Sequence, residues 1–300
     1  MAAGAATTKD TVEEAALPFD RRRHGMIIGM GAVGLVLEDH ETAAKRGIAP
    51  CGELLAESMV NSAFHGTRLD IDHISKTVAN LVDRACQREG ITPTQMAPST
   101  MFMSHETYTP ARGGSSAAEI AALRQAFGEQ ATEVRIANTK GFTGHPMGAG
   151  IEDAIAIKAL QYGRVPPIAN LTEPDPDLMP IRLSEGENVR CQYALRLAAG
   201  FGSQLALCLW KAAARDNERV TDGALRARWL QDITGFSSVE EVLEQRTLRV
   251  IASESDDVLY DFAGADTTRH LIDEATRWTV AVLLAEKKAE AIIEAIMSGW

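Results

Sequence analysis

The feature that most constrains the fold is an alternation of extended and helical segments between residues 26 and 210. Short apolar runs typical of buried strands alternate with longer stretches whose apolar residues recur at helical spacing. This alternation predicts an α/β layered fold, in which helices cover a mixed sheet. The expected strands are residues 26–38, 50–59, 100–104, 134–137, 193–198 and 205–210, and the expected helices are residues 69–88, 115–127 and 147–162.

Composition argues against several classes of protein. The chain has 300 residues and a formal net charge of −11, so its mean field repels nucleic acids and anionic membranes. No apolar run reaches the roughly 18 residues that a membrane-spanning helix needs, and the N-terminus lacks the apolar region of a secretory signal. The cysteines are widely spaced and form no CxxC pair. We therefore expect a cytoplasmic protein with reduced thiols and no metal site.

The sequence changes character after Trp210. It becomes polar and acidic, and a long amphipathic helical pattern follows over residues 268–296. This change places a domain boundary near residue 212. We expect three parts: a lead segment over residues 1–17, an α/β domain over residues 18–211, and an acidic linker with a helical extension over residues 212–300.

Three segments that follow expected strands carry residues capable of chemistry. They are residues 103–109 with His105, residues 138–150 with Lys140 and His145, and residues 199–203 with a Gly-Phe-Gly turn. Sites in α/β sheets tend to form in the loops at strand ends. Each piece alone is more often structural, because a single strand-end histidine is usually a satisfied polar residue and a glycine-rich turn is usually only a turn. Together they indicate an acyl-transfer or enolate-stabilising site.

The second of these segments favours the stabilisation of negative charge. Its glycines allow tight turns and the close approach of another group. His145 is expected just before a helix N-terminus, where the helix dipole favours an anion and lowers the pKa of an imidazole. A neutral imidazole can donate one hydrogen bond. Lys140, five residues upstream, is placed to anchor a carboxylate or to orient the histidines.

The order of these motifs resembles that of the β-ketoacyl synthases of fatty-acid and polyketide assembly, over roughly residues 18–210. The matching segments are Pro18-Phe-Asp20 with Arg23 and Gly25, residues 29–38 (GMGAVGLVLE), residues 105–109 (HETYT), residues 140–150 (KGFTGHPMGAG), residues 166–170 (PPIAN) with Pro174, and residues 200–203 (GFGS). The resemblance implies the C-terminal half of a thiolase-like fold. It also implies an acyltransferase that joins an acyl thioester to a malonyl-type extender with loss of CO2.

The resemblance also implies roles for individual residues. His105 and His145 would stabilise the enolate oxygen and assist decarboxylation, and Lys140 would orient them. The backbone N–H of Phe201 would be one donor of an oxyanion hole. No cofactor would bind tightly, because the phosphopantetheine arm of an acyl carrier protein brings the substrate. The substrate-binding residues would be Thr107 and Thr109, whose hydroxyls hydrogen-bond that arm, and Gly200 and Gly202 of the turn.

The sequence departs from the family pattern around the first histidine. Glu106 stands where the motif HGTxTxxGDxxE has its first glycine, and Tyr108 is bulky. The stretch from His105 to Glu119 is three residues longer than that motif, and the Gly-Asp pair is lost. These changes alter the geometry of the loop but leave both histidines and Lys140 in place.

The resemblance further implies a nucleophilic cysteine upstream of Pro18, and no cysteine of this chain has that setting. One half of a two-half fold would leave apolar helix and sheet surfaces uncovered. We therefore expect the chain to need either the upstream part of a longer polypeptide, as an N-terminal ketosynthase half, or another subunit that carries the cysteine, in a dimer or hetero-oligomer. An acyl carrier protein would be a second partner. The isolated chain would be inactive.

Two alternatives stay open. The chain could be a non-catalytic, ketosynthase-like scaffold similar to a chain-length factor, which the missing cysteine favours and the retained histidines disfavour. A thiolase is a weaker alternative. Residues 144–148 (GHPMG) match its GHPxG turn, but the cysteine that thiolases usually carry near the C-terminus is not found in residues 285–300.

Overall fold

The computed structural model describes residues 6–65, 69–109, 115–146, 148–200, 202–215, 219–244, 247–253 and 260–261. The chain divides into two compact units. The first contains the described residues up to Ala32 together with Gly52–Ala212. The second contains Val33–Cys51 and the described residues from Ala213 onward.

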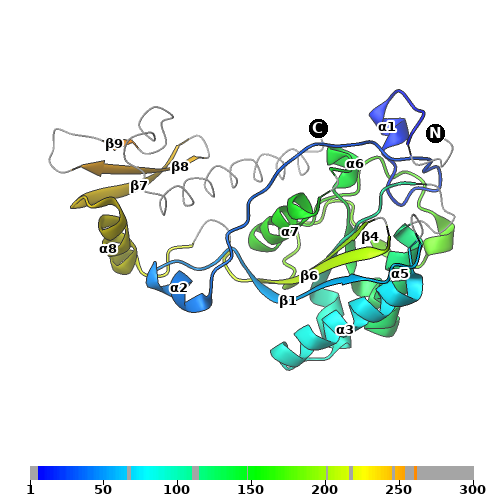
Figure 1. Ribbon diagram of the computed structural model, residues 1–300, viewed down its shortest axis with the longest axis horizontal. Helices are drawn as coiled ribbons and strands as arrows, with labels where there is room; N and C mark the ends of the chain where they lie inside the picture. Colours follow the sequence, from blue (N-terminus) through cyan, green and yellow to red (C-terminus); the bar gives the residue numbers. More distant parts are fainter. Residues whose placement is uncertain are drawn as a thin grey trace. The chain divides into compact units, whose positions relative to one another are not determined.

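The first unit is built on a six-stranded mixed sheet with the strand order β1-β6-β5-β2-β3-β4 (Figure 1). β6 pairs antiparallel with both β1 and β5, whereas β2, β3 and β4 run parallel to β5. The mixed sheet confirms the predicted α/β layered fold. The strands are β1 (Gly52–Asn61), β2 (Thr100–Met103), β3 (Arg135–Ala137), β4 (Arg182–Leu183), β5 (Tyr193–Gly200) and β6 (Gln204–Ala212).

Helices cover both faces of this sheet (Figure 1). α3 (Ile71–Glu89) and α5 (Ser115–Phe127) pack together on one face, and α7 (Gly150–Tyr162) lies on the other. α3 begins after Asp70, whose carboxylate accepts from the backbone N–H of His73, and it ends at Gly90 in the left-handed conformation. Shorter pieces are α1 (Val12–Ala15), α4 (Pro93–Met96), α6 (Lys140–Thr143) and the 3₁₀ turns η1 (Ala97–Ser99), η2 (Gly128–Glu133) and η3 (Pro176–Leu178).

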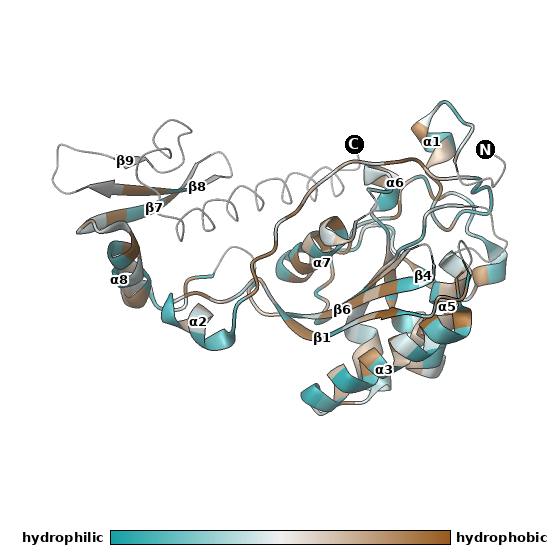
Figure 2. Ribbon diagram, in the orientation of Figure 1, coloured by the Kyte–Doolittle hydropathy of each residue, from teal (hydrophilic) through white to brown (hydrophobic). Residues whose placement is uncertain are grey.

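The hydrophobic core lies between the sheet and the α3–α5 pair. Val78 and Leu81 of α3 belong to the same buried cluster as Leu195 and Leu207 of the sheet. Figure 2 shows the apolar strand β6 in brown and the solvent-facing residues of α3 in teal. α7 differs from α3 because it is buried on nearly every side, which agrees with its almost continuously apolar sequence. The core packs α5 on one face of the sheet, α7 contacts the other face through β5 and β6, and both helices contribute residues to the site described below.

The structure describes all of residues 26–38 and contains no strand there, so this prediction is wrong. Single parallel bridges join Met26 to Ala6 and Ile28 to His145, and no hydrogen bond among the described residues involves the backbone of residues 30–38. Met30, Leu35, Val36 and Leu37 are exposed, and the extended segment is brown in Figure 2. A run that is apolar on both faces needs a neighbouring strand and cover on each side, which the described residues do not supply.

The helix predicted over residues 147–162 begins later than expected. α7 starts at Gly150, and Met147 lies outside the described residues. Pro146 disfavours helical backbone at the residue before it, His145. His145 is therefore in an extended bridge between α6 and α7, and not directly in front of a helix.

The second unit has its own secondary structure. α2 (His40–Lys45) is capped by Asp39, and α8 (Gly223–Thr234) is capped by Asp222. A three-stranded antiparallel sheet is formed by β7 (Ser238–Glu244), β8 (Thr247–Ser253) and β9 (Tyr260–Asp261). The segment expected to be a linker after residue 212 thus holds a helix and a small sheet. The helix predicted over residues 268–296 lies outside the described residues, and no helix that the structure does describe could cross a bilayer.

Candidate functional site

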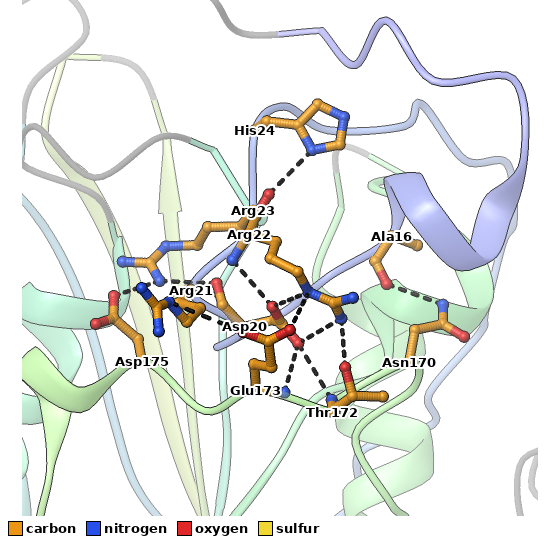
Figure 3. Close-up of polar contacts among 10 residues, drawn as sticks. All are labelled: Ala16, Asp20, Arg21, Arg22, Arg23, His24, Asn170, Thr172, Glu173 and Asp175. Carbon is orange, nitrogen blue, oxygen red and sulfur yellow. Dashed lines mark hydrogen bonds and ion pairs between the residues drawn. The ribbon is translucent and has the colours of Figure 1, made fainter.

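The site is framed by Asp20, whose buried carboxylate joins two segments far apart in the sequence (Figure 3). It accepts hydrogen bonds from Arg22 and from the backbone N–H groups of Thr172 and Glu173. Burial alone would raise the pKa of Asp20, but these hydrogen bonds outweigh it and lower the pKa well below its ordinary value. The carboxylate therefore fastens the residue 18–25 segment to the loop that follows Asn170.

From this anchor the chain runs along the loop that carries the first histidine. The backbone N–H of Gly25 donates to the carbonyl of Tyr108, and the N–H of Ile27 donates to its hydroxyl. Two residues further on, Gly29 N–H donates to the carbonyl of His145, and His145 N–H donates to the carbonyl of Ile27. The segment thus contacts both histidine loops and holds them side by side.

The two predicted histidines meet. His105 follows β2 and is almost fully buried, His145 is half-buried, and their ring centroids lie 5.5 Å apart in an edge-to-face arrangement. Burial, followed by the positive charge of Lys140, lowers the pKa of both imidazoles. The predicted direction of the shift is confirmed for His145, but its main cause is desolvation. Both rings are therefore neutral near pH 7.

Lys140 lies at the start of α6 with its ammonium group buried. Its Nζ donates to Oε1 of Glu152 at 2.7 Å, and Glu152 is itself buried in the first turn of α7. Contact with a carboxylate was one of the two alternatives expected for Lys140, and the structure places it against Glu152, which the sequence analysis did not name. The signal was present, because Glu152 and Asp153 are the only acidic residues of the α7 sequence.

Asp153 uses its carboxylate in a second buried ion pair. Arg196 of β5 donates through Nε and Nη2 to both carboxylate oxygens, at 2.9 and 2.7 Å, and Trp210 Nε1 donates to Oδ1. The guanidinium is one of the charges that lower the pKa of His105, after burial, Lys140 and His145. The first turn of α7 thus sends one carboxylate to Lys140 and the next to the sheet.

A third buried carboxylate, that of Glu119, contacts the residue before His105; the sequence analysis named Glu119 in the motif but did not predict this contact. Ser104 Oγ donates to Oε2 of Glu119 at 2.5 Å, and the other oxygen, Oε1, has no hydrogen-bond partner among the described residues. Burial and, after it, the nearby Glu106 carboxylate raise the pKa of Glu119 to about 8, while the hydrogen bond from Ser104 opposes the shift. Both neighbours of His105 in the sequence therefore involve a buried carboxylate. Glu106 carries one itself, and Ser104 donates to that of Glu119.

The structure says less about the predicted substrate-binding residues. Thr107 is buried, and its hydroxyl lies 3.5 Å from that of Thr109. Gly200 ends β5, and Gly202 has a φ of 82°, which a side-chain-bearing residue rarely adopts. Phe201 lies outside the described residues. The roles assigned to these four residues and to Phe201 therefore stay predictions.

Three of the cysteines are not activated, because burial raises the pKa of Cys86, Cys191 and Cys208 to about 11. A thiol with a raised pKa is protonated near neutral pH and is a poor nucleophile. Cys208 contacts the Arg196 guanidinium within the buried Asp153 cluster, which gives it a structural environment.

Comparisons with known proteins identify the family. The family model described as "Beta-ketoacyl synthase, C-terminal domain" matches residues 55–172. The 3-oxoacyl-[acyl-carrier-protein] synthase 2 of Vibrio harveyi is 33% identical over 215 residues, covering 69% of this chain and 49% of that protein. Its counterpart in Coxiella burnetii is 29% identical over 204 residues, covering 65% of this chain and 46% of that protein. The chain spans about half the length of the curated relatives it matches.

Solved structures with the same fold are also ketosynthases. A type II PKS acyl-carrier protein in complex with its ketosynthase bound to the hexaketide matches with a TM-score of 0.59 and 28% identity, over 70% of this chain and 51% of that chain. The ishigamide ketosynthase/chain length factor matches with a TM-score of 0.60 and 25% identity, over 70% of this chain and 48% of that chain.

The sheet, its covering helices and the paired histidines, with these matches, define a domain of the thiolase superfamily. Within that class, the chain carries the C-terminal domain of a β-ketoacyl synthase, a family of fatty-acid and polyketide biosynthesis. The predicted resemblance and fold class are confirmed.

Proposed function

We propose that this chain is part of a β-ketoacyl synthase that condenses an acyl thioester with a malonyl-type extender on an acyl carrier protein. The observation that carries the proposal is the pair of imidazoles, one buried and one half-buried, whose ring centroids lie 5.5 Å apart and whose pKa values the buried Lys140 ammonium helps to lower. The Vibrio harveyi relative is a 3-oxoacyl-[acyl-carrier-protein] synthase, and one structural neighbour is bound to an acyl-carrier protein. Both facts support an extender carried on phosphopantetheine.

In the proposed reaction, the bond between the extender's α-carbon and its carboxylate breaks. CO2 leaves, and the electron pair of that bond forms an enolate. His105 and His145 donate hydrogen bonds to the enolate oxygen and so lower the energy of the anion. The enolate carbon then attacks the carbonyl of an acyl thioester, and the cysteine sulfur that carried the acyl group leaves as a thiolate. The Phe201 N–H is the proposed oxyanion donor for this second step.

The lowered pKa values of the histidines suit this role. A neutral imidazole donates a hydrogen bond to the enolate, whereas an imidazolium would be a much stronger acid and could protonate the carbanion before it attacks. Burial and the Lys140 charge keep both rings neutral near pH 7. Nδ1 of His145 is buried without a hydrogen-bond partner among the described residues, so that ring is not committed to a structural contact at this atom.

The nucleophilic cysteine is proposed to come from a partner, either an N-terminal ketosynthase half or a separate subunit. Two observations support this. The chain spans about half the length of its relatives. In addition, residues 30–38 carry exposed apolar side chains, and their backbone takes part in no hydrogen bond among the described residues. We propose that this segment adds as a strand to the sheet of the cysteine-bearing partner.

The test is to co-express the full chain with a cysteine-bearing N-terminal ketosynthase half and to purify the complex. A labelled acyl thioester should load onto the partner, and malonyl-acyl carrier protein should then give a β-ketoacyl product. His105→Ala should lower the condensation rate about 10²–10⁴-fold without reducing acyl loading. His40→Ala, at the exposed start of α2, is the matched control. If His105→Ala condenses as fast as the unaltered complex, the catalytic assignment is wrong.

The same experiment separates a second candidate function. One structural neighbour is a ketosynthase/chain length factor, so a non-catalytic scaffold is consistent with the fold. A scaffold would leave the condensation rate of the complex unchanged in both His105→Ala and His145→Ala. Retention of both histidines together with the Lys140–Glu152 pair favours the catalytic role.

A further inference from the structure

Glu106, the residue directly after His105, is completely buried and uses its carboxylate to hold two separate segments. Oε2 accepts from Ser115 Oγ at 2.7 Å and from the backbone N–H of Ser116 at 2.8 Å. Oε1 accepts from the backbone N–H of Tyr108 at 3.1 Å. The carboxylate therefore caps the N-terminus of α5 and closes the histidine loop on itself. Ser115 and Ser116 both lie inside the helix, so the carboxylate that caps it comes from outside α5.

The backbone of Glu106 is tied down as well. Its N–H donates to Ser104 Oγ at 2.8 Å, and its carbonyl accepts from Asn138 Nδ2 at 2.9 Å. Oδ1 of Asn138 in turn accepts from the N–H of Lys140. The residue after His105 is thus joined to the loop that carries Lys140, so a shift at Glu106 would reach both sides of the site.

The buried charge is balanced by one cation. Nε of Arg23 lies 3.7 Å from Oε1 of Glu106, and Nη1 of the same guanidinium contacts Asp175 at 2.5 Å. Figure 3 shows Arg23 reaching Asp175 next to the Asp20 anchor. Burial raises the pKa of Glu106, and the hydrogen bonds from Ser115 and the helix, with the Arg23 charge, oppose this. Glu106 is therefore connected to the frame of the site as well as to the histidine.

We propose that Glu106 is a positioning residue for His105, and that its carboxylate replaces the one that the motif HGTxTxxGDxxE places three residues before Glu119, at position 116. In this chain position 116 is a serine. The carboxylate comes instead from Glu106, which stands where the motif has a glycine after the histidine. The proposal rests on the proposed function only because it takes His105 to be a catalytic residue. It states that the histidine loop needs one carboxylate, at position 106 or at position 116, to hold its conformation.

The test is a double-mutant cycle on the full chain, read without any assay of activity. The variants are Glu106→Gly, Ser116→Asp and the double variant E106G/S116D, with Glu129→Gly, at an exposed glutamate, as the control for the cost of a glycine. Hydrogen exchange is measured at the amides of Ser116 and Tyr108. The chemical shift and line width of the His105 imidazole are followed by NMR.

Glu106→Gly should speed exchange at both amides about ten- to one-hundred-fold, because each loses a charged acceptor, and should shift and broaden the His105 resonance. Ser116→Asp alone brings a second carboxylate against Glu106 and should lower the melting temperature. E106G/S116D should return Tyr108 exchange and the His105 resonance toward those of the unaltered chain. If Glu106→Gly behaves like Glu129→Gly, or if the double variant shows no recovery, the proposal is overturned.

A milder variant keeps the test decisive if Glu106→Gly does not fold. Glu106→Gln preserves the shape of the side chain and one acceptor oxygen, so only one of the two amides keeps its acceptor. Exchange should rise at either Tyr108 or Ser116, and the His105 resonance should shift. Unchanged exchange at both amides with an unchanged His105 resonance would show that the carboxylate does not position the histidine.

Discussion

Lys140 and Glu152 form an ion pair in which Nζ donates to Oε1 at 2.7 Å and both side chains are almost completely removed from solvent. The pair joins α6 to the first turn of α7, on either side of His145 in the sequence. A buried pair of this kind contributes little if both partners are replaced together, but it is costly to break from one side. It therefore constrains how the site can be altered.

Lys140→Met should destabilise the folded chain by about 3–5 kcal/mol, because it leaves the Glu152 carboxylate buried without its cation. Replacing both residues, as Lys140→Met with Glu152→Leu, should recover much of that loss. Chemical denaturation measures both effects. Lys45→Met breaks the exposed pair with Glu41 on α2 and should leave the free energy of unfolding nearly unchanged. Equal losses for Lys140→Met and Lys45→Met would contradict the role given to burial.

Removing the Lys140 charge should also raise the pKa of both histidines. The ammonium group disfavours each imidazolium, so its loss makes protonation easier, while burial continues to oppose it. An NMR titration of the two ring resonances in Lys140→Met, compared with Lys45→Met, checks the direction. A pKa that stays the same or falls for both rings would mean that Lys140 does not act on them electrostatically.

Glu119 should make the protein less stable as the pH rises. Its pKa is about 8 in the folded protein against 4.5 for an unperturbed carboxyl, so between these values the folded state holds a proton that the unfolded state has lost. The contribution is fully present below the lower value and disappears as the pH rises through the upper one, with a slope of at most about 1.4 kcal/mol per pH unit. Glu119→Gln should remove this slope. Denaturation of both proteins between about pH 5 and pH 9 tests it, and parallel profiles would refute it.

Gly29 should tolerate no side chain, whereas Gly34 should. A Cβ at Gly29 would lie 2.0 Å from the carbonyl oxygen of Thr143, so the backbone beside His145 would have to move. A Cβ at Gly34 meets no atom within 4 Å. We expect Gly29→Ala to lower the melting temperature and shift the His145 resonance, and Gly34→Ala to do neither. If the two variants behave alike, the segment around Gly29 does not pack against Thr143 as it does in this structure.

The elements that depend on local pattern were predictable from sequence. The apolar spacing of α3, with Gly90 after it, and the run of Ser115–Phe127 in α5 gave helices close to their observed bounds. Residues 26–38 also have a local strand pattern, but a strand exists only when a neighbour takes up its hydrogen bonds, and that neighbour is not among the described residues. Sequence alone does not contain that condition.

The candidate site divides in the same way. His105, Lys140 and His145 were predicted because each belongs to a motif with a fixed order along the chain. Their partners were missed because the contacts Lys140–Glu152 and Ser104–Glu119 join residues twelve and fifteen positions apart, across loops whose path the sequence does not fix. Glu106 was noticed as a departure from the motif, but its use as a helix cap depends on the fold bringing Ser116 within reach.

If the proposed partner pairs with residues 30–38, the bridge between Ile28 and His145 couples that pairing to the position of a proposed catalytic residue. A partner that binds residues 30–38 would contact the chain directly after the Ile27 carbonyl and the Gly29 N–H, which hydrogen-bond the His145 backbone. If binding of that partner changes the affinity of His145 for a ligand, the ligand changes the affinity for the partner by the same factor, because coupling between two binding sites is reciprocal. In the proposed assembly, a substrate that binds against His145 would therefore also strengthen the binding of the partner.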